Sequence, residues 1–250
     1  MELSHFTYGW VNPVMAYGIS FLGSLLGLLC TARARSERAG AHPGRWLVLA
    51  AVAIGGTGIW LMHFMAMLGF TVTGTDIRYN VPLTVASAVA AVGVVGTGLF
   101  IVGTGRLSIW RLLGGGVLTG VGVAIMHYMG MAAMQVSGDL AYQPLLVAAS
   151  VLIAVIAATV ALWFTVVARR PLAITLAALI MGVAVVGMHY TGMAALEVHA
   201  HANASRLSGA DPFSFLMPVV LLLGIVVIVV LYAVLTDDPY EQPARPGVST

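Results

Sequence analysis

Long apolar stretches alternate with short polar ones along the whole chain. A helix needs about 20 mostly apolar residues to cross a membrane, and seven stretches meet this requirement. The predicted spans run from Pro13 to Thr31, Trp46 to Leu68, Val81 to Gly103, Arg111 to Met134, Pro144 to Ala168, Pro171 to Leu196 and Ser214 to Leu235. The pattern therefore predicts an all-α membrane protein with seven transmembrane helices in residues 1–235. The polar residues 236–250 are predicted to form a short, disordered tail.

The arginines predict how the chain is oriented. Nine of the eleven lie in or beside the loops after the first, third and fifth spans, or in the tail, and only Arg78 and Arg206 lie in the opposite loops. The positive-inside rule then places the N-terminus outside and the C-terminus in the cytoplasm. The second, fourth and sixth spans therefore run outward.

One short motif occurs late in each of these three outward spans. It has methionine, histidine, an aromatic residue (tyrosine in two copies and phenylalanine in the other), a variable residue, a small residue and a second methionine. The copies are Met62-His63-Phe64-Met65-Ala66-Met67, Met126-His127-Tyr128-Met129-Gly130-Met131 and Met188-His189-Tyr190-Thr191-Gly192-Met193. Each histidine comes five to seven residues before the predicted end of its span. At 1.5 Å per residue, the three lie at a common depth, roughly 7–11 Å below the outer boundary.

The spacing of the copies predicts that the histidines converge. They are 64 and then 62 residues apart, which is the length of one helix pair. Repeats of equal topology are related by rotation about the membrane normal, which turns equivalent side chains toward one axis. Small residues that allow close helix approach lie on the same faces. Three follow the histidines by three positions and three precede them by seven: Ala66, Gly130 and Gly192, and Gly56, Gly120 and Gly182.

Composition excludes several classes of protein. Hydrophobic residues make up 60% of the chain and charged residues 8%, against about a quarter charged in soluble domains. There is no lysine for a retinal Schiff base and no basic face for nucleic acid. Every acidic residue falls outside the spans or at their edges, which disfavours a proton relay. Neither an acid–base pair nor a nucleophile constellation appears, so no enzymatic activity is expected.

The motif residues suit a soft or borderline metal ion. Imidazole binds copper, zinc, iron or nickel, and a thioether favours copper, so histidine with methionine and no carboxylate or thiolate indicates copper before zinc. The candidate ligands are His63, His127 and His189, with Met67, Met131 and Met193 one helical turn outward. These methionines are equally consistent with core packing, which is the interpretation favoured for Met62, Met126 and Met188. Another alternative is that each histidine only hydrogen-bonds a neighbour.

Other residues near the motifs have simpler interpretations. Tyr128 and Tyr190 are predicted to be interfacial aromatic residues near the outer leaflet. His199 and His201, in the loop before the last span, could capture metal ions outside, although loop histidines commonly have no such role.

The three motifs on alternate spans resemble the MHYT domain, a bacterial seven-helix membrane sensor family. The resemblance covers nearly the whole chain and includes the segment Asn80-Val81-Pro82-Leu83-Thr84. Only the third copy, Met188-His189-Tyr190-Thr191, matches the signature in full. Because tyrosine and threonine are not present in all three copies, a ligand role for them does not follow.

The resemblance implies a copper site formed by the six residues named above, and sensing of a diatomic gas such as oxygen, carbon monoxide or nitric oxide. It also implies a multi-pass protein of the bacterial cytoplasmic membrane. Many members carry a cytoplasmic output domain, which this chain is not expected to contain. A separate cytoplasmic or membrane signalling partner is therefore expected.

Two other functions remain open at this stage. The protein could handle copper, delivering it to another membrane metalloenzyme, because the site faces outward and no output domain is expected. It could also bind haem through two of the histidines as axial ligands.

Overall fold

The computed structural model describes residues 3–4, 9–35, 43–72, 76–105, 108–200 and 208–236. Seven helices in these ranges are long and apolar enough to cross a membrane. They are α1 (Val11–Ala34), a second span in three parts, α2 (Pro43–Ala51), η1 (Val52–Leu61) and α3 (Met62–Met67), then α4 (Val81–Gly103), α5 (Ile109–Ala132), α6 (Pro144–Val167), α7 (Pro171–Ala194) and α8 (Leu216–Thr236), the last preceded by the short 3-10 helix η2 (Pro212–Phe215). The seven predicted spans are confirmed, and no end differs by more than three residues.

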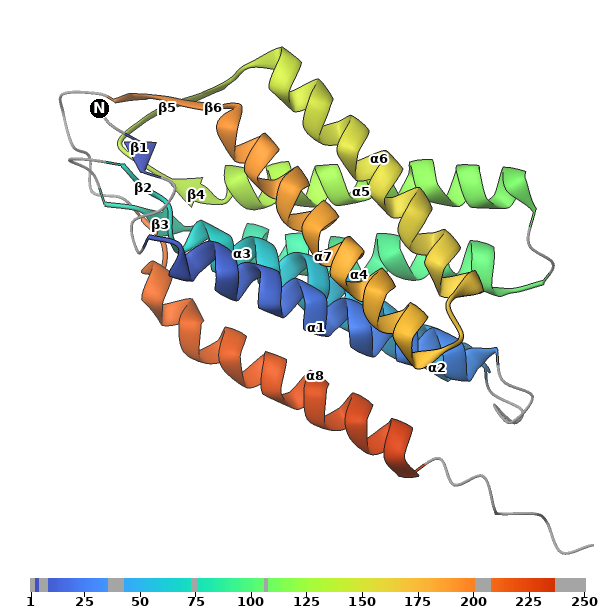
Figure 1. Cartoon of the computed structure of the whole chain (residues 1–250). Coiled ribbons are helices and arrows are strands. Elements are labelled where there is room, and N and C mark those ends of the chain that lie inside the picture. The colour runs from blue at the N-terminus through green and yellow to red at the C-terminus, as the bar shows by residue number, and fades with distance from the viewer. Residues whose placement is uncertain are drawn as a thin grey trace, which may run out of the picture.

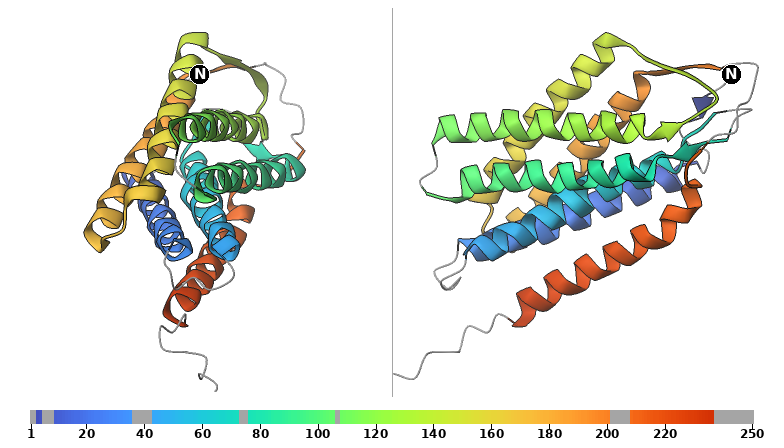
Figure 2. Two further views of the ribbon diagram at one scale, coloured as in Figure 1. Left: turned by 90° about the vertical axis from the view of Figure 1, so that its right-hand side faces the viewer. Right: turned by 180° about the vertical axis from the view of Figure 1, so that it is seen from behind.

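Six of the seven spans form a closed bundle. The second span contacts α1 and α4, α5 contacts α4 and α6, and α7 contacts α6 and returns to α1. Each of the three motif-bearing spans therefore lies between two motif-free spans. Helix α8 lies outside this six-helix bundle, against α1 and the second span (Figures 1 and 2).

Local sequence explains where several helices begin. Asn80 caps α4, its side-chain oxygen accepting a hydrogen bond from the backbone N–H of Leu83 at 3.0 Å. Pro82, Pro144 and Pro171 occupy the first turns of α4, α6 and α7, where a missing N–H breaks no helical hydrogen bond.

Short antiparallel strand pairs join the loops at the end of the bundle that bears the motifs, called here the outer end. β1 (Leu3–Ser4) pairs with β2 (Thr71–Val72), β3 (Arg78–Tyr79) with β4 (Met134–Gln135), and β5 (Gly138–Tyr142) with β6 (Leu196–Ala200). The strands lie together at this end (Figure 1). The sequence predicts only loops there, because strands of two to five residues carry too little periodicity to be recognised.

The second span contains a segment that sequence analysis did not predict. η1 is a π-helix, in which the hydrogen bonds run from i to i+5 and the turn is wider than in an α-helix. A methyl group added to Gly55 of η1 would lie 2.7 Å from the carbonyl oxygen of Ala91, whereas one added to Gly56 would meet only side chains, at 3.5 Å or more. The close-contact glycine of the first copy is therefore Gly55, and its prediction as Gly56 was wrong.

Candidate metal centre

The three motif histidines meet inside the bundle at its outer end. His63 comes from α3, His127 from α5 and His189 from α7, and their exposed fractions are 3%, 1% and 1%. The imidazole planes stand nearly edge to face, with centroids 4.9–5.1 Å apart. The predicted convergence on one axis is therefore confirmed by the geometry, since these residues are 62 to 126 apart in sequence.

The same nitrogen of each ring points toward the common centre. Nδ1 of His63 lies 3.0 Å from Nδ1 of His189 and 3.1 Å from Nδ1 of His127. Imidazole nitrogens bind zinc at about 2.0–2.1 Å, so two of them at a tetrahedral angle around such an ion lie about 3.3–3.4 Å apart. The observed spacing is within a few tenths of an ångström of that value.

Hydrogen bonding alone cannot satisfy this arrangement. In a neutral imidazole, Nδ1 is either a donor with one proton or an acceptor with one in-plane lone pair. Nδ1 of His63 faces two other Nδ1 atoms and can satisfy only one of them well. A metal ion accepts all three lone pairs at once, so the residues present fit a bound ion better than they fit a self-contained hydrogen-bonded group.

No second group of this kind occurs in the part of the chain that the structure describes. His63, His127 and His189 are the one set of three or more histidine, cysteine, aspartate or glutamate side chains placed to hold an ion together. The site is thus neutral and composed of imidazoles, which suits copper, zinc or iron better than magnesium or calcium.

Glycines of neighbouring copies leave room for the imidazoles. A methyl group on Gly130 would lie 2.4 Å from Nε2 of His63, and one on Gly192 would lie 2.3 Å from Nε2 of His127. The small residues predicted close approach of a helix backbone at these positions, but the group that approaches is a histidine side chain of the preceding copy. Nε2 of His127 has no hydrogen-bond partner among the described residues.

A family model described as "Bacterial signalling protein N terminal repeat", named MHYT, matches residues 56–115 and 120–178. These two matches contain the first two motifs, with His63 and His127. The chain belongs to the MHYT family. The third motif, around His189, lies beyond the matched residues but supplies the third imidazole of the same cluster.

Curated relatives that match the MHYT region are signalling proteins. The chain is 38% identical over 197 residues to the bifunctional diguanylate cyclase/cyclic di-GMP phosphodiesterase MucR of Pseudomonas aeruginosa, a match that covers 76% of this chain and 28% of the relative. It is 36% identical over 222 residues to the cyclic di-GMP phosphodiesterase NbdA of the same species, covering 80% and 28%. It is 30% identical over 206 residues to the signaling protein YkoW of Bacillus subtilis, covering 80% and 25%.

The matched region is only a part of each relative, because the chain spans about a quarter of their length. No solved structure matches the chain. The comparisons thus establish a multi-pass membrane domain of a signalling family.

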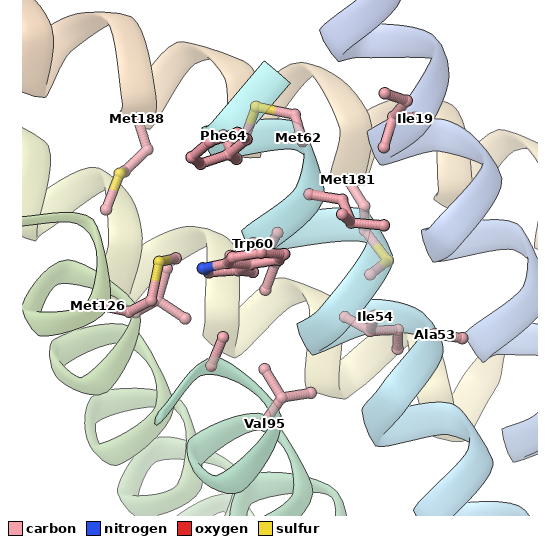
Figure 3. Close-up of a cluster of buried hydrophobic side chains, with 14 of the residues drawn as sticks. Ile19, Ala53, Ile54, Trp60, Met62, Phe64, Val95, Met126, Met181 and Met188 are labelled. Carbon is pink, nitrogen blue, oxygen red and sulfur yellow. The ribbon is translucent and has the colours of Figure 1, made fainter. Parts of the chain in front are cut away.

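The first and last methionines of each motif copy are buried. Met67, Met131 and Met193 have exposed fractions of 1%, 0% and 2%, which is compatible with both ligation and packing, so their role as ligands stays a prediction. Met62, Met126 and Met188 lie in a cluster of hydrophobic side chains with Trp60 and Phe64 (Figure 3). This position agrees with the packing role favoured for them.

The aromatic residues after the histidines face different neighbours in different copies. The Tyr128 hydroxyl lies 2.7 Å from the Ser150 hydroxyl of α6. Phe64 instead stacks on Trp60 and contacts Tyr79 and Phe215 beneath the outer strands. Burial raises the pKa of the Tyr79 phenol above its ordinary value, so this residue stays neutral.

Several sequence-based predictions fall on residues whose placement is not described. His201 and the tail from residue 237 onward lie outside the described ranges. The backbone of His199 belongs to β6 and pairs with Asp139 of β5. A metal-capturing role for these two histidines therefore stays a prediction.

Proposed function

We propose that this chain is a copper-binding sensor of the bacterial cytoplasmic membrane, with His63, His127 and His189 as ligands. The observation that carries the proposal is that Nδ1 of His63 lies 3.0–3.1 Å from Nδ1 of both His127 and His189 in a buried, uncharged site. Imidazole with nearby thioether sulfur favours copper over zinc. Met67, Met131 and Met193 are the proposed additional soft ligands.

Sensing is favoured over other uses of copper because the relatives that contain this domain are signalling proteins. Relatives that align with it carry names of signalling proteins and of cyclic di-GMP enzymes. In this proposal, binding of copper, or of a diatomic gas to the bound copper, would shift the three motif helices relative to one another. A separate signalling partner then reads this shift, and the chain itself is not an enzyme. Copper delivery to another metalloenzyme has no comparable support.

The haem alternative fits the geometry poorly. Two axial histidines bind haem iron from opposite faces of the macrocycle. Here Nδ1 of His63 lies only 3.0–3.1 Å from Nδ1 of the other two histidines, and no porphyrin fits between them.

Metal analysis of the purified chain tests the proposal. The wild type is expected to retain about one copper ion per chain, and the His63→Ala/His127→Ala/His189→Ala variant is expected to retain none. The matched control is Met62→Leu/Met126→Leu/Met188→Leu, which changes three buried residues next to the histidines and is expected to keep its copper. Single His→Gln variants, each with a side chain closer in size, guard against misfolding of the triple variant.

Equal copper in the wild type and in all histidine variants would end the metal assignment. Gas binding is tested on the reduced, copper-loaded chain. An infrared C–O stretching band that shifts with isotopically labelled carbon monoxide is expected in the wild type and not in the histidine variants.

A further inference from the structure

A small cavity lies inside the six-helix bundle on the inner side of the histidine cluster. Its volume is about 60 Å³, and its walls come from η1, α4, α5, α6 and α7. Ile54, Val95, Met181 and Met188, four of the residues that line it, are labelled in Figure 3 and come from η1, α4 and α7. Residues of all three motif-bearing spans therefore line the cavity.

Its position relative to the histidines is the same in each copy. Ile59, Val123 and Val185 all line the cavity, and each precedes its motif histidine by four residues. Residues four apart on a helix lie on one face about one turn apart, which is roughly 5.4 Å along the axis. Part of the cavity wall therefore lies about one helical turn below each imidazole, and α6 contributes further wall residues.

The chemistry of the cavity walls excludes water as an ordinary occupant. The wall is almost wholly apolar, and its two hydroxyl groups already bond to backbone carbonyl oxygens. Thr165 donates to Leu162 at 2.6 Å, and Thr119 donates to Val94 at 3.5 Å. A buried water needs two to four polar partners, whereas dry apolar cavities bind small apolar species such as xenon.

We propose that this cavity is a docking pocket for a diatomic gas molecule, from which the gas reaches the imidazole cluster. The volume admits a species of a few atoms, and Ile59, Val123 and Val185 of its wall lie about one helical turn from the three histidines. This inference deepens the proposed function by giving the gas a site of its own. Only the destination of the gas depends on copper, because the pocket is formed by apolar side chains that bind no metal.

Xenon binding to the full chain in lipid nanodiscs tests the pocket without any metal. The xenon NMR shift is expected to change in a saturable way with the wild type and with the histidine triple variant. Ala158→Leu, which fills the cavity from α6, is expected to abolish this change. The control Ala148→Leu adds the same side chain to an exposed position of α6 and is expected to behave as the wild type.

A second measurement links the pocket to the metal. In copper-loaded protein, Ala158→Leu is expected to keep its copper but to rebind carbon monoxide about tenfold more slowly after flash photolysis. If Ala158→Leu does not fold, Ala154→Leu fills the same cavity from the same helix.

Three results would overturn the inference: no saturable xenon effect, the same effect in Ala158→Leu and Ala148→Leu, or an effect seen in detergent but absent in nanodiscs. The last result would mean that a lipid tail occupies the cavity. Loss of copper from the histidine variants with no xenon binding would remove the pocket and leave the metal proposal standing. Saturable xenon binding to a wild-type chain that retains no copper would remove the metal proposal and leave the pocket standing.

Discussion

The second span and the other two motif-bearing helices bring equivalent histidines to one point by different paths. In α5 and α7, a glycine that lies against a neighbouring helix precedes the histidine by seven residues. Gly120 of α5 lies against α6, and Gly182 of α7 lies against α1. In the second span the corresponding glycine is Gly55, eight residues before His63. Both Gly55 and Gly120 press on backbone atoms of the helix that follows, at Ala91 and Ala154.

The second span therefore has one residue more than α5 or α7 between the glycine and the histidine, and this additional residue lies within η1. Gly58 precedes His63 by five residues and meets backbone atoms of α1, and Gly122 precedes His127 by five residues and meets Val94 of α4. The copies are therefore in register from Gly58 onward and out of register by one residue at Gly55. Single-residue insertions of this kind are absorbed as π-turns, often at functional sites. The second span thus places His63 in the cluster by forming the π-helix η1 in place of a regular α-helix.

The second span also differs in its surroundings. In an 18-residue stretch of each span, 78% of the second span is buried, against 50% for α5 and 33% for α7. The difference arises because α8 contacts the outside of η1, a position with no counterpart at α5 or α7. The first copy is therefore the one held on all sides.

The largest effect is expected from removing one residue. Deleting Gly56 gives the second span the seven-residue spacing of α5, so a regular α-helix keeps both Gly55 and His63 in place. Deleting Val121 from α5 rotates Gly120 by about 100° relative to His127. The helix can then keep either the contact of Gly120 with α6 or the position of His127 in the cluster, but not both. We expect the Gly56 deletion to retain copper, with a Tm within about 5 °C of the wild type, and the Val121 deletion to lose most of its copper and to unfold earlier.

Thermal unfolding reports on this prediction without reference to metal. If the two deletions are equally harmful, the additional residue is not absorbed by η1 and the register argument is wrong.

The sequence predicted the fold well, because its strongest signals are those of membrane helices. Apolar length located seven spans, and the equal spacing of His63, His127 and His189 predicted that they would meet. The π-segment could not be foreseen. Residues 116–125 of α5 contain three glycines, as η1 does, yet they form an α-helix. The choice depends on tertiary contacts with neighbouring helices, which override local preference.

The site was predicted in its members but not in its detail. Which imidazole nitrogen faces the centre depends on side-chain rotamers, and the residues that touch Nε2 of His63 and His127 belong to other copies of the repeat. The cavity was also not predicted, because a void is the space left between helices once they are packed. Ile59, Val123 and Val185 look in the sequence like ordinary apolar residues.

An intermediate effect is expected where glycines contact the imidazoles. Gly130→Ala places a methyl group 2.4 Å from Nε2 of His63, so that side chain must move and the Nδ1 triangle opens. Gly192→Ala acts in the same way on His127. Changes beside metal-binding histidines lower affinity by about 10- to 100-fold, and we expect a loss in that range for both variants in a copper competition titration against a chelator.

Ala66 makes the first copy its own control, because it already carries a methyl group at the equivalent position. Ala66→Gly lowers stability by about 1 kcal/mol through helix propensity, and we expect copper affinity to stay within about threefold of the wild type. An unchanged affinity in Gly130→Ala would show that His63 does not need its present position.

The smallest effect is expected from making the second copy resemble the first. Tyr128→Phe introduces the residue type found at Phe64 and removes the 2.7 Å contact between the Tyr128 and Ser150 hydroxyls. Ser150 still donates to the carbonyl oxygen of Val147 at 2.8 Å, so its hydroxyl keeps a hydrogen-bond partner. Hydrogen bonds between membrane helices contribute about 0.6 kcal/mol on average, and we expect a coupling energy of that size in a double-mutant cycle with Ser150→Ala. Copper content is expected to be unchanged, because the first copy supplies its histidine without a tyrosine beside it. A fall in copper content would instead give the second-copy tyrosine a role that Phe64 cannot perform, and the copies would then differ in chemistry as well as in helical register.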